Sequence, residues 1–241
     1  MGESLALGID TATPVQSIAL MDGDRLIEDC RRRVEFDHSS SLLANLDDGF
    51  REHDWEPGDL DLIAVGIGPG SFTGVRIGLS LAKGIARGAE VPLVGVSSPG
   101  CQATSHARRS PGRYVCAAYD AQRREVYTGT FVHRRESDRT VPVVDDALVE
   151  PAELRARLER WADDEDRTIT VVGNGTERFE ELGRWDRPDI RALPPADATP
   201  SGVDAIRLGR QAFDERGPDD LARLEPNYIR PSSAEENDED D

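Results

Sequence analysis

Apolar and polar positions follow two periods along the first half of the chain. Short stretches alternate or run apolar, as β-strands do, and longer ones place apolar residues three and four positions apart, as amphipathic helices do. Turn residues separate them, for example Asp22-Gly23-Asp24 inside a hairpin. The pattern predicts strands at 5–10, 16–21, 25–33, 60–67 and 92–97, and helices at 39–53, 73–88 and 99–109.

The second half repeats this order of elements. It predicts strands at 113–120, 125–134, 142–149, 168–173 and 189–193, and helices at 151–162, 176–183 and 200–216. Two α/β units in tandem, each opening with a hairpin, are typical of a duplicated actin-like ATPase fold, of the ASKHA or ribonuclease H-like type. A single doubly wound sheet is the alternative.

The repeat also predicts the division of the chain. We expect a first lobe at 1–110, completed by the helix at 200–216, and a second lobe at 111–199. Residues 217–231 form a C-terminal extension. Residues 232–241 are almost all acidic or small and polar, and we expect them to be disordered.

The net charge of the chain limits which partners it can bind directly. The 241-residue chain has a net charge of −18, and all but one of its 29 basic residues are arginine, the exception being Lys83. This composition resembles that of halophilic proteins, in which salt screens the repulsion between carboxylates. Basic clusters such as Arg31–Arg33 are too short for a nucleic-acid groove, so we expect another subunit to hold any nucleic acid.

The sequence gives limited information about cellular location and metal binding. The apolar runs are too short to span a membrane and no signal peptide opens the chain, so we expect a cytoplasmic protein that binds no membrane. Its three cysteines lack CxxC spacing, and its histidines form no HxxxH pair. We therefore expect no metal site, and three cysteines that act as small buried apolar residues.

The most unusual segment is GPGSFTGVRIG at 68–78, which follows a buried strand and opens a helix. Such a glycine loop can hold an anion at a helix N-terminus, but its spacing matches neither the P-loop nor the dinucleotide fingerprint. The phosphate interpretation stays open. The candidate loop contacts are Gly68, Gly70, Ser71, Phe72, Thr73 and Arg76.

Small residues recur every fourth position on the helix that follows. Gly74, Gly78 and Ala82 form one row, and Gly84 and Gly88 form a second. Each interior glycine costs a helix about 0.5–1 kcal/mol relative to alanine, so something must offset that loss. Close approach of another backbone is the simplest explanation, either the sheet of this chain or a helix of another chain.

Two turns occupy the places where actin-like ATPases bind phosphate. Asp10-Thr11-Ala12 has alanine at or beside the expected glycine, and Asp120-Ala121-Gln122 also lacks glycine. Asp10 and Asp120 could still place water or Mg²⁺, and Thr11 is a further candidate for nucleotide contact at an interface, but both turns lack the glycine that lets phosphate approach. A third turn, Gly173-Asn174-Gly175, resembles the one that holds adenosine in such folds, although a plain strand–turn–helix explains it equally well.

Taken together, these motifs resemble the TsaB (YeaZ) family. The resemblance covers nearly the whole chain, and its most specific part is GPGSFTG at 68–74. The other matching segments are Ile9–Thr13, His38-Ser39, Gly95–Ser97, Asp120-Ala121, Glu125–Tyr127 and Glu225–Arg230. The turn Gln122–Arg124 departs from the shorter, glycine-containing turn of many relatives, and so puts in doubt any nucleotide contact there.

The resemblance implies an actin-like chain that has lost catalysis. Family members pair with the catalytic homologue TsaD, and the ATPase TsaE joins them. The complex transfers threonylcarbamoyl to N6 of adenosine 37 in tRNAs that read codons beginning with A. The chain would then contact tRNA only through TsaD and bind no cofactor tightly, with ATP or ADP and Mg²⁺ at the interface of the complex.

The resemblance also suggests where the partner docks. We expect an interface built from the helices at 39–53 and 73–88, and a homodimer through the same face when the chain is alone. The predicted interface residues are Leu42, Leu43, Leu46, Phe50, Gly74, Gly78 and Ala82. The alternatives are a stand-alone ATPase or small-molecule kinase of this fold, a metallopeptidase, and a scaffold unrelated to tRNA.

Overall fold

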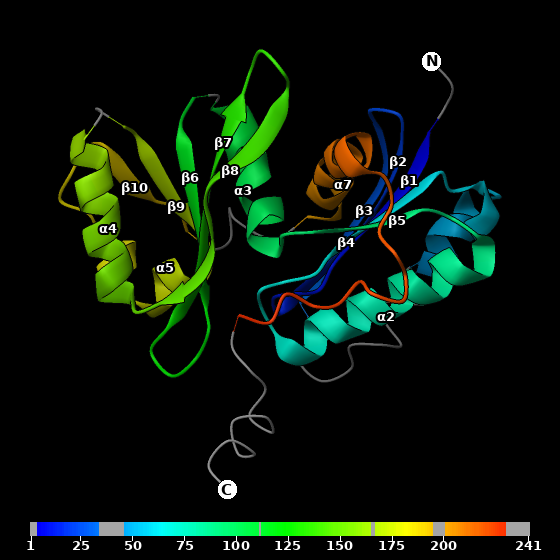
Figure 1. Ribbon diagram of the computed structural model, residues 1–241, viewed down its shortest axis with the longest axis horizontal. Helices are drawn as coiled ribbons and strands as arrows, with labels where there is room; N and C mark the ends of the chain where they lie inside the picture. The colour runs from blue at the N-terminus through cyan, green and yellow to red at the C-terminus, as the bar shows by residue number, and fades with distance from the viewer. Residues whose placement is uncertain (1–3, 34–45, 111, 165–166, 195–200, 230–241) are drawn as a thin grey trace, which may run out of the picture.

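The chain folds into two lobes that lie side by side (Figure 1). The computed structural model describes residues 4–33, 46–110, 112–164, 167–194 and 201–229. Each lobe contains a five-stranded sheet, and the two sheets have corresponding strand orders, β3-β2-β1-β4-β5 and β8-β7-β6-β9-β10. This correspondence confirms the predicted duplication and excludes the single doubly wound sheet.

The first sheet is built around the apolar strand β1. Its strands are β1 (Leu5–Asp10), β2 (Val15–Asp22), β3 (Arg25–Arg33), β4 (Leu62–Gly66) and β5 (Leu93–Val96). β1 pairs antiparallel with β2 and parallel with β4, and all its residues are buried. A strand with helices on both faces needs apolar side chains on both, which explains its nearly continuous apolar run.

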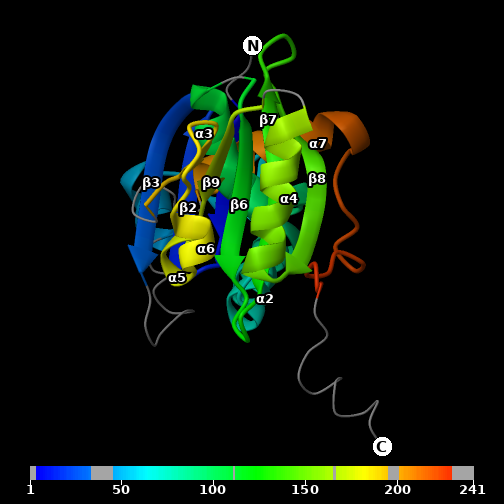
Figure 2. The same ribbon diagram turned by 90° about the vertical axis from the view of Figure 1, so that its left-hand side faces the viewer.

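The second sheet repeats the arrangement around β6. Its strands are β6 (Tyr114–Asp120), β7 (Val126–Arg134), β8 (Arg139–Val149), β9 (Ile169–Val172) and β10 (Ile190–Ala192). The helix α4 (Pro151–Asp164) crosses the outward face of this sheet (Figure 2). Two short helices, α5 (Gly175–Arg178) and α6 (Glu180–Gly183), follow β9.

Two helices fill the space between the sheets. α7 (Gly202–Arg216) packs on the first sheet, and α3 (Ser98–Arg109) packs against α7, β6 and β7. The helix α2 (Phe72–Ala89) covers the outer face of the first sheet. The order of layers is therefore α2, first sheet, α7 with α3, second sheet, α4, with a hydrophobic cluster between each pair of neighbouring layers.

The segment after α7 returns along the first lobe (Figure 1). The amide of Asp219 donates to the carbonyl oxygen of Leu93, at 2.8 Å, and the amide of Asn227 donates to that of Ile67, also at 2.8 Å. Leu221 and Leu224 pack against the core under α2. Residues 217–229 are thus fastened to β5 and to the loop after β4 of the first lobe.

The predicted elements are present, with three differences. Helical structure covers residues 46–52 of the predicted 39–53, whose first seven residues lie outside the described part, and a short 3₁₀ helix, η1 (Pro57–Asp59), follows. The predicted helix at 176–183 is divided into α5 and α6 because Phe179 adopts an extended conformation. β8 begins three residues before the prediction, at Arg139. No helix in the described residues is long and apolar enough to cross a membrane.

Candidate functional site

A cleft of about 520 Å³ lies between the two lobes. Four loops surround it: the turn from β1 to β2, the loop before α2, the turn from β6 to β7, and the turn after β9. The C-terminal segment closes one side. Among its lining residues are Ala12, Gly70, Ser71, Phe72, Thr73, Asp120, Gln122, Asn174 and Tyr228. The cleft thus brings together most of the loop residues predicted from the sequence.

The β1–β2 turn is packed against the loop before α2. The amide of Ser71 donates to the carbonyl oxygen of Ala12, at 2.7 Å. A side chain added to Gly70 would collide with the backbone and methyl group of Ala12. These two loops are therefore packed directly against each other, and Ala12, Gly70 and Ser71 together form part of the wall of the cleft.

Asp10 is sealed beneath this turn and does not line the cleft. Its side chain is fully buried, and its Oδ1 accepts a 3.0 Å hydrogen bond from the amide of Ala12. Burial raises the pKa of Asp10 to about 6, although the Ala12 amide, the Ser98 hydroxyl and the Cys101 thiol act in the opposite direction. Among the described residues, Oδ2 has no partner of hydrogen-bonding geometry. This carboxyl group is part of the core, where it cannot reach a ligand.

Asp120 does line the cleft, but neighbouring residues hold it. Its amide donates to Oδ1 of Asn174, at 3.0 Å, and its Oδ1 accepts from the amide of Gln122, at 2.9 Å. The three residues that follow, 122–124, all have positive φ angles, of 60°, 48° and 62°. Such a left-handed run is rare for residues other than glycine. It falls on Gln122–Arg124, the segment that differs from the shorter, glycine-containing turn of many relatives. The turn after β9, which resembles the adenosine turn of such folds, here positions Asp120 through Asn174.

An aromatic and cationic stack stands at the mouth of the cleft. The guanidinium carbon of Arg76 lies 3.7 Å from the ring centre of Phe72, and Nε of Arg76 donates to Oη of Tyr228, at 2.5 Å. The rings of Phe72 and Tyr228 are 5.2 Å apart. The C-terminal motif is visible in the sequence, but its contact with Arg76 is not, because no local pattern links two residues 152 positions apart.

Gly68 and Thr11 have structural roles outside the cleft. The Gly68 amide donates to Oγ of Ser98, at 3.2 Å, and the Ser98 amide donates back to the Gly68 carbonyl oxygen, at 3.0 Å. The Thr11 hydroxyl donates to the carbonyl oxygen of Gly74 in the first turn of α2, at 2.7 Å. Both residues fasten the loop before α2 to the body of the lobe.

The first row of small residues on α2 faces the sheet, which corrects part of the predicted interface. Gly74, Gly78 and Ala82 are buried, and a side chain on either glycine would collide with Thr11. Leu46 and Phe50 are also buried, in the same core cluster. Their own lobe covers these residues, so they cannot form an exposed docking patch. Leu42 and Leu43 lie outside the described residues.

The second row faces the opposite way. Gly84 and Gly88 are exposed, and within the described part of the chain no heavy atom lies within 4 Å of a β-carbon added to either glycine. Ile77 and Leu81 share this helical face and are half-buried. Of the two explanations for the glycines, the sheet therefore accounts for the first row and leaves the second unexplained.

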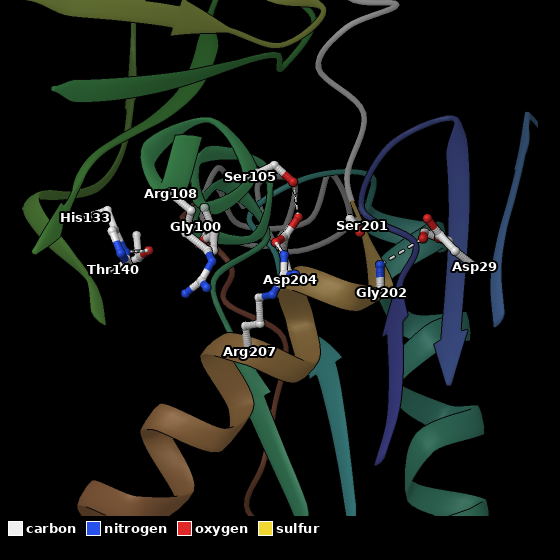
Figure 3. A network of polar contacts seen from close by, with 12 residues as sticks. Asp29, Gly100, Ser105, Arg108, His133, Thr140, Ser201, Gly202, Asp204 and Arg207 are labelled. Carbon is white, nitrogen blue, oxygen red and sulfur yellow. Dashed lines mark hydrogen bonds and ion pairs between the residues drawn. The ribbon is translucent and has the colours of Figure 1, made fainter. Parts of the chain in front are cut away.

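Polar contacts lie on both sides of the space between the lobes (Figure 3). Asp204 of α7 is buried, accepts a hydrogen bond from the Ser105 hydroxyl of α3, and forms a 2.9 Å ion pair with Arg207. On the second lobe, His133 contacts the Thr140 hydroxyl at 3.3 Å (Figure 3). The described residues contain no group of three or more histidine, cysteine or acidic side chains arranged to hold a metal.

Comparison with known proteins gives consistent matches over most of the chain. The family model described as TsaD, tRNA N6-adenosine threonylcarbamoyltransferase, matches residues 32–230. The protein named tRNA threonylcarbamoyladenosine biosynthesis protein TsaB is 31% identical in Escherichia coli, over 93% of this chain and 94% of that one. Its Bacillus subtilis counterpart is 29% identical over 95% of each chain. The solved structure of YeaZ from Pseudomonas aeruginosa superposes with a TM-score of 0.79 at 25% identity, covering 93% of this chain and 99% of that one.

The paired sheets and the cleft between them define the class of the protein, a duplicated α/β chain of the actin-like ATPase fold. Within that class, the chain belongs to the TsaB (YeaZ) family. The resemblance noted in the sequence is confirmed.

Proposed function

We propose that the chain is the non-catalytic partner of TsaD in threonylcarbamoyl transfer to N6 of adenosine 37 of tRNAs reading codons that begin with A. Membership of the TsaB family supports the role in threonylcarbamoyladenosine biosynthesis. The observation that supports the non-catalytic part is the alanine at position 12, in the turn where actin-like ATPases have a glycine; this alanine packs against Gly70 and Ser71.

Charge supports the proposed division of labour. A net charge of −18 opposes direct binding of a phosphate backbone, so TsaD holds the tRNA and this chain reaches it only through TsaD. TsaE completes the assembly, in the cytoplasm. This chain holds no cofactor tightly, and ATP or ADP with Mg²⁺ binds at the interface of the complex.

The outward face of α2 is the proposed docking surface for TsaD. Ile77, Leu81, Gly84 and Gly88 follow one another at helical spacing on this face. Two exposed glycines would weaken an isolated helix by about 0.5–1 kcal/mol each. A partner helix that packs closely over them would offset that loss, as small residues allow helix backbones to approach. The helical residues 46–52 extend the surface beside α2.

The same face supports a homodimer when TsaD is absent. Light scattering after gel filtration should give twice the mass of 26.4 kDa for the wild-type chain, and addition of TsaD should replace this species with a heterodimer. A monomer at high micromolar concentration would contradict the homodimer, and a TsaD complex that leaves the homodimer intact would contradict the shared face.

Reconstitution tests the function itself. TsaD, TsaE, threonylcarbamoyl-adenylate synthase and unmodified tRNA are combined with and without this chain, and modified adenosine is measured by mass spectrometry. We expect modification only when the chain is present, and no ATP hydrolysis by the chain alone. Equal modification without the chain would refute the proposed role.

A further inference from the structure

Arginines of both lobes stand at the mouth of the cleft. Arg123 of the second lobe lines the cleft, and Arg124 follows it in the same β6–β7 turn, where both are exposed. On the first lobe, Arg76 of α2 stacks on Phe72 and Tyr228, two residues that also line the cleft. We call Arg76, Arg123 and Arg124 the arginine rim.

Little negative charge offsets the arginine rim. Asp120 is the one acidic residue among the described residues that line the cleft, and it already pairs with Arg178, at 3.6 Å. Glu125, at the end of the β6–β7 turn, is half-buried. Arg124 forms no ion pair with another described residue. Positive charge at the mouth is therefore incompletely neutralised, on a chain whose net charge is −18.

The backbone of the β6–β7 turn holds its two arginines in a fixed place. The amide of Ala121 donates to the carbonyl oxygen of Glu125, and the amide of Glu125 donates to that of Gln122, both at 2.9 Å. Residues 122–124 all lie in the left-handed region. Backbone conformations of this kind persist where the surrounding structure enforces them, and they are concentrated at binding sites. The turn thus presents exposed arginines from a constrained backbone.

The C-terminal segment leads directly to the arginine rim. Ile229, the last residue that the structure describes before 230–241, lines the cleft together with Arg123. Its neighbour Tyr228 is held by Arg76, whose Nε donates to Oη at 2.5 Å. Figure 1 shows this segment ending between the β6–β7 turn and the start of α2. The residues that follow therefore leave the described part of the chain at the mouth of the cleft.

The next residues have the opposite charge to the rim. Between positions 235 and 241 the chain has six carboxylates, those of Glu235, Glu236, Asp238, Glu239, Asp240 and Asp241. Six residues lead from Ile229 to Glu235, and an extended chain covers at most about 3.3–3.6 Å per residue, so the first carboxylate reaches about 20 Å from Ile229. A tether this short keeps the attached group at an effective concentration of about the millimolar range. A weak attraction is then sufficient to hold the acidic residues at the rim.

We propose that the acidic tail, residues 235–241, docks on the arginine rim of its own chain and covers the mouth of the cleft. Guanidinium groups and carboxylates form charge-assisted hydrogen bonds, which are stronger than those between neutral groups. The rest of the chain is also acidic and repels the tail from other faces. Salt screens contacts between exposed charges, so high ionic strength releases the tail. This contact does not depend on the partner proposed above.

The first experiment compares the full-length ¹⁵N-labelled chain with a full-length neutral-tail variant, in which each glutamate of 235–241 is replaced by glutamine and each aspartate by asparagine. NMR follows the Nε–Hε resonances of the arginine side chains in 0.05 M KCl. We expect the resonances of the arginine rim to differ between the two proteins, and the difference to shrink at least threefold in 1 M KCl. Arg160, an exposed arginine of α4, is the reference and should not shift.

A peptide with the sequence of residues 232–241 tests the same contact in trans. Added to the neutral-tail variant, it should shift the rim resonances with a Kd on the order of 1 mM. The double substitution Arg123→Gln and Arg124→Gln should weaken this binding at least fivefold, and Arg160→Gln is the matched control that should leave it unchanged. Inorganic tripolyphosphate should compete with the peptide for the rim. Thermal melts verify that each variant is folded.

Three results would overturn the proposal. The first is identical rim resonances in the wild-type and neutral-tail proteins in 0.05 M KCl. The second is a peptide that shifts Arg160 as strongly as Arg123 and Arg124, which would show a general attraction between charges instead of docking. The third is simultaneous binding of peptide and tripolyphosphate at the rim, which would show that the tail leaves the mouth of the cleft open.

Discussion

The Thr11 hydroxyl donates a 2.7 Å hydrogen bond to the carbonyl oxygen of Gly74, and the Thr11 side chain lies against the Cα of Gly78 one turn further along α2. The turn that the sequence placed at a phosphate site is thus a packing surface for a helix. Glycine at 74 and 78 is required because the backbone and side chain of Thr11 occupy the space that a β-carbon would need. Gly74 and Gly78 therefore belong to an inner row, which packs against Thr11, whereas Gly84 and Gly88 form an outer row on the exposed side of α2.

The inner row makes the first prediction. Gly78→Leu should destabilise the free chain by about 3 kcal/mol or more, because the new side chain collides with Thr11 in a packed core. In a chain of this size each kcal/mol lowers Tm by roughly 2–4 °C, so a fall of about 6 °C or more is expected in a thermal melt. An unchanged Tm would contradict the observed packing.

The outer row makes the opposite prediction. Gly84→Leu should leave the free chain folded and raise its stability by about 0.5–1 kcal/mol, since leucine favours a helix more than glycine does and the position is open. It should also abolish co-purification with TsaD, because the side chain blocks close approach of a partner helix. Retained binding would place the interface elsewhere.

Asp10 should give the stability of the chain a distinctive pH dependence. Its pKa is about 6 in the folded chain and 3.8 when unperturbed, so the folded state keeps the proton over a range in which the unfolded state releases it. Stability is therefore lost as pH rises from about 4 to about 6, by roughly 3 kcal/mol at most for this group.

The variant Asp10→Asn isolates this effect. Asparagine cannot ionise but can still accept the Ala12 amide, so the variant should gain about 2–3 kcal/mol relative to wild type between pH 4 and pH 7. Urea unfolding at both pH values measures the difference. Parallel pH profiles would show that Asp10 is not protonated in the fold.

The stack at the mouth of the cleft should anchor the C-terminal segment. Tyr228→Ala removes the ring that contacts Phe72 and the hydroxyl that accepts from Arg76, whereas Tyr228→Phe removes only the hydroxyl. Amide exchange over residues 217–229 should accelerate by about tenfold in the alanine variant and less in the phenylalanine variant, because an exposed stacked pair contributes about 1 kcal/mol. Equal exchange rates in all three proteins would contradict an anchoring role for the stack.

The acidic composition predicts a response to salt. With a net charge of −18, repulsion between carboxylates should destabilise the chain in dilute buffer, and molar KCl should screen it. We expect the urea midpoint to rise clearly between 0.05 M and 2 M KCl. Equal midpoints would show that the scarcity of lysine has another cause, such as GC-rich coding.

The repeated order of elements was accessible from the sequence because each strand and helix carries its own period. β1 and β6 occupy equivalent places in their sheets, as the repeat predicted. β8 begins at Arg139, before the predicted start at 142, and includes Pro142, because an edge strand tolerates proline within it. The break at Phe179 is a backbone change that no composition signal marks.

The site was harder to predict because its important contacts join distant parts of the chain. A four-residue spacing shows that Gly78 and Ala82 share a helical face, but not whether that face meets the protein or solvent. Likewise, Asp10 could be recognised as a candidate ligand residue, while its burial depends on how Ala12 meets the loop before α2. These outcomes are set by tertiary packing.

The central claim is that this chain acts through the outer face of α2 and not through its cleft. The most direct measurement is the yield of modified adenosine in the reconstituted reaction with Gly84→Leu and, separately, with Asp120→Asn in the cleft. We predict that Gly84→Leu reduces the yield to that of a reaction lacking the chain, whereas Asp120→Asn leaves it within about twofold of wild type. Full activity of Gly84→Leu, together with loss of activity in Asp120→Asn, would contradict this account.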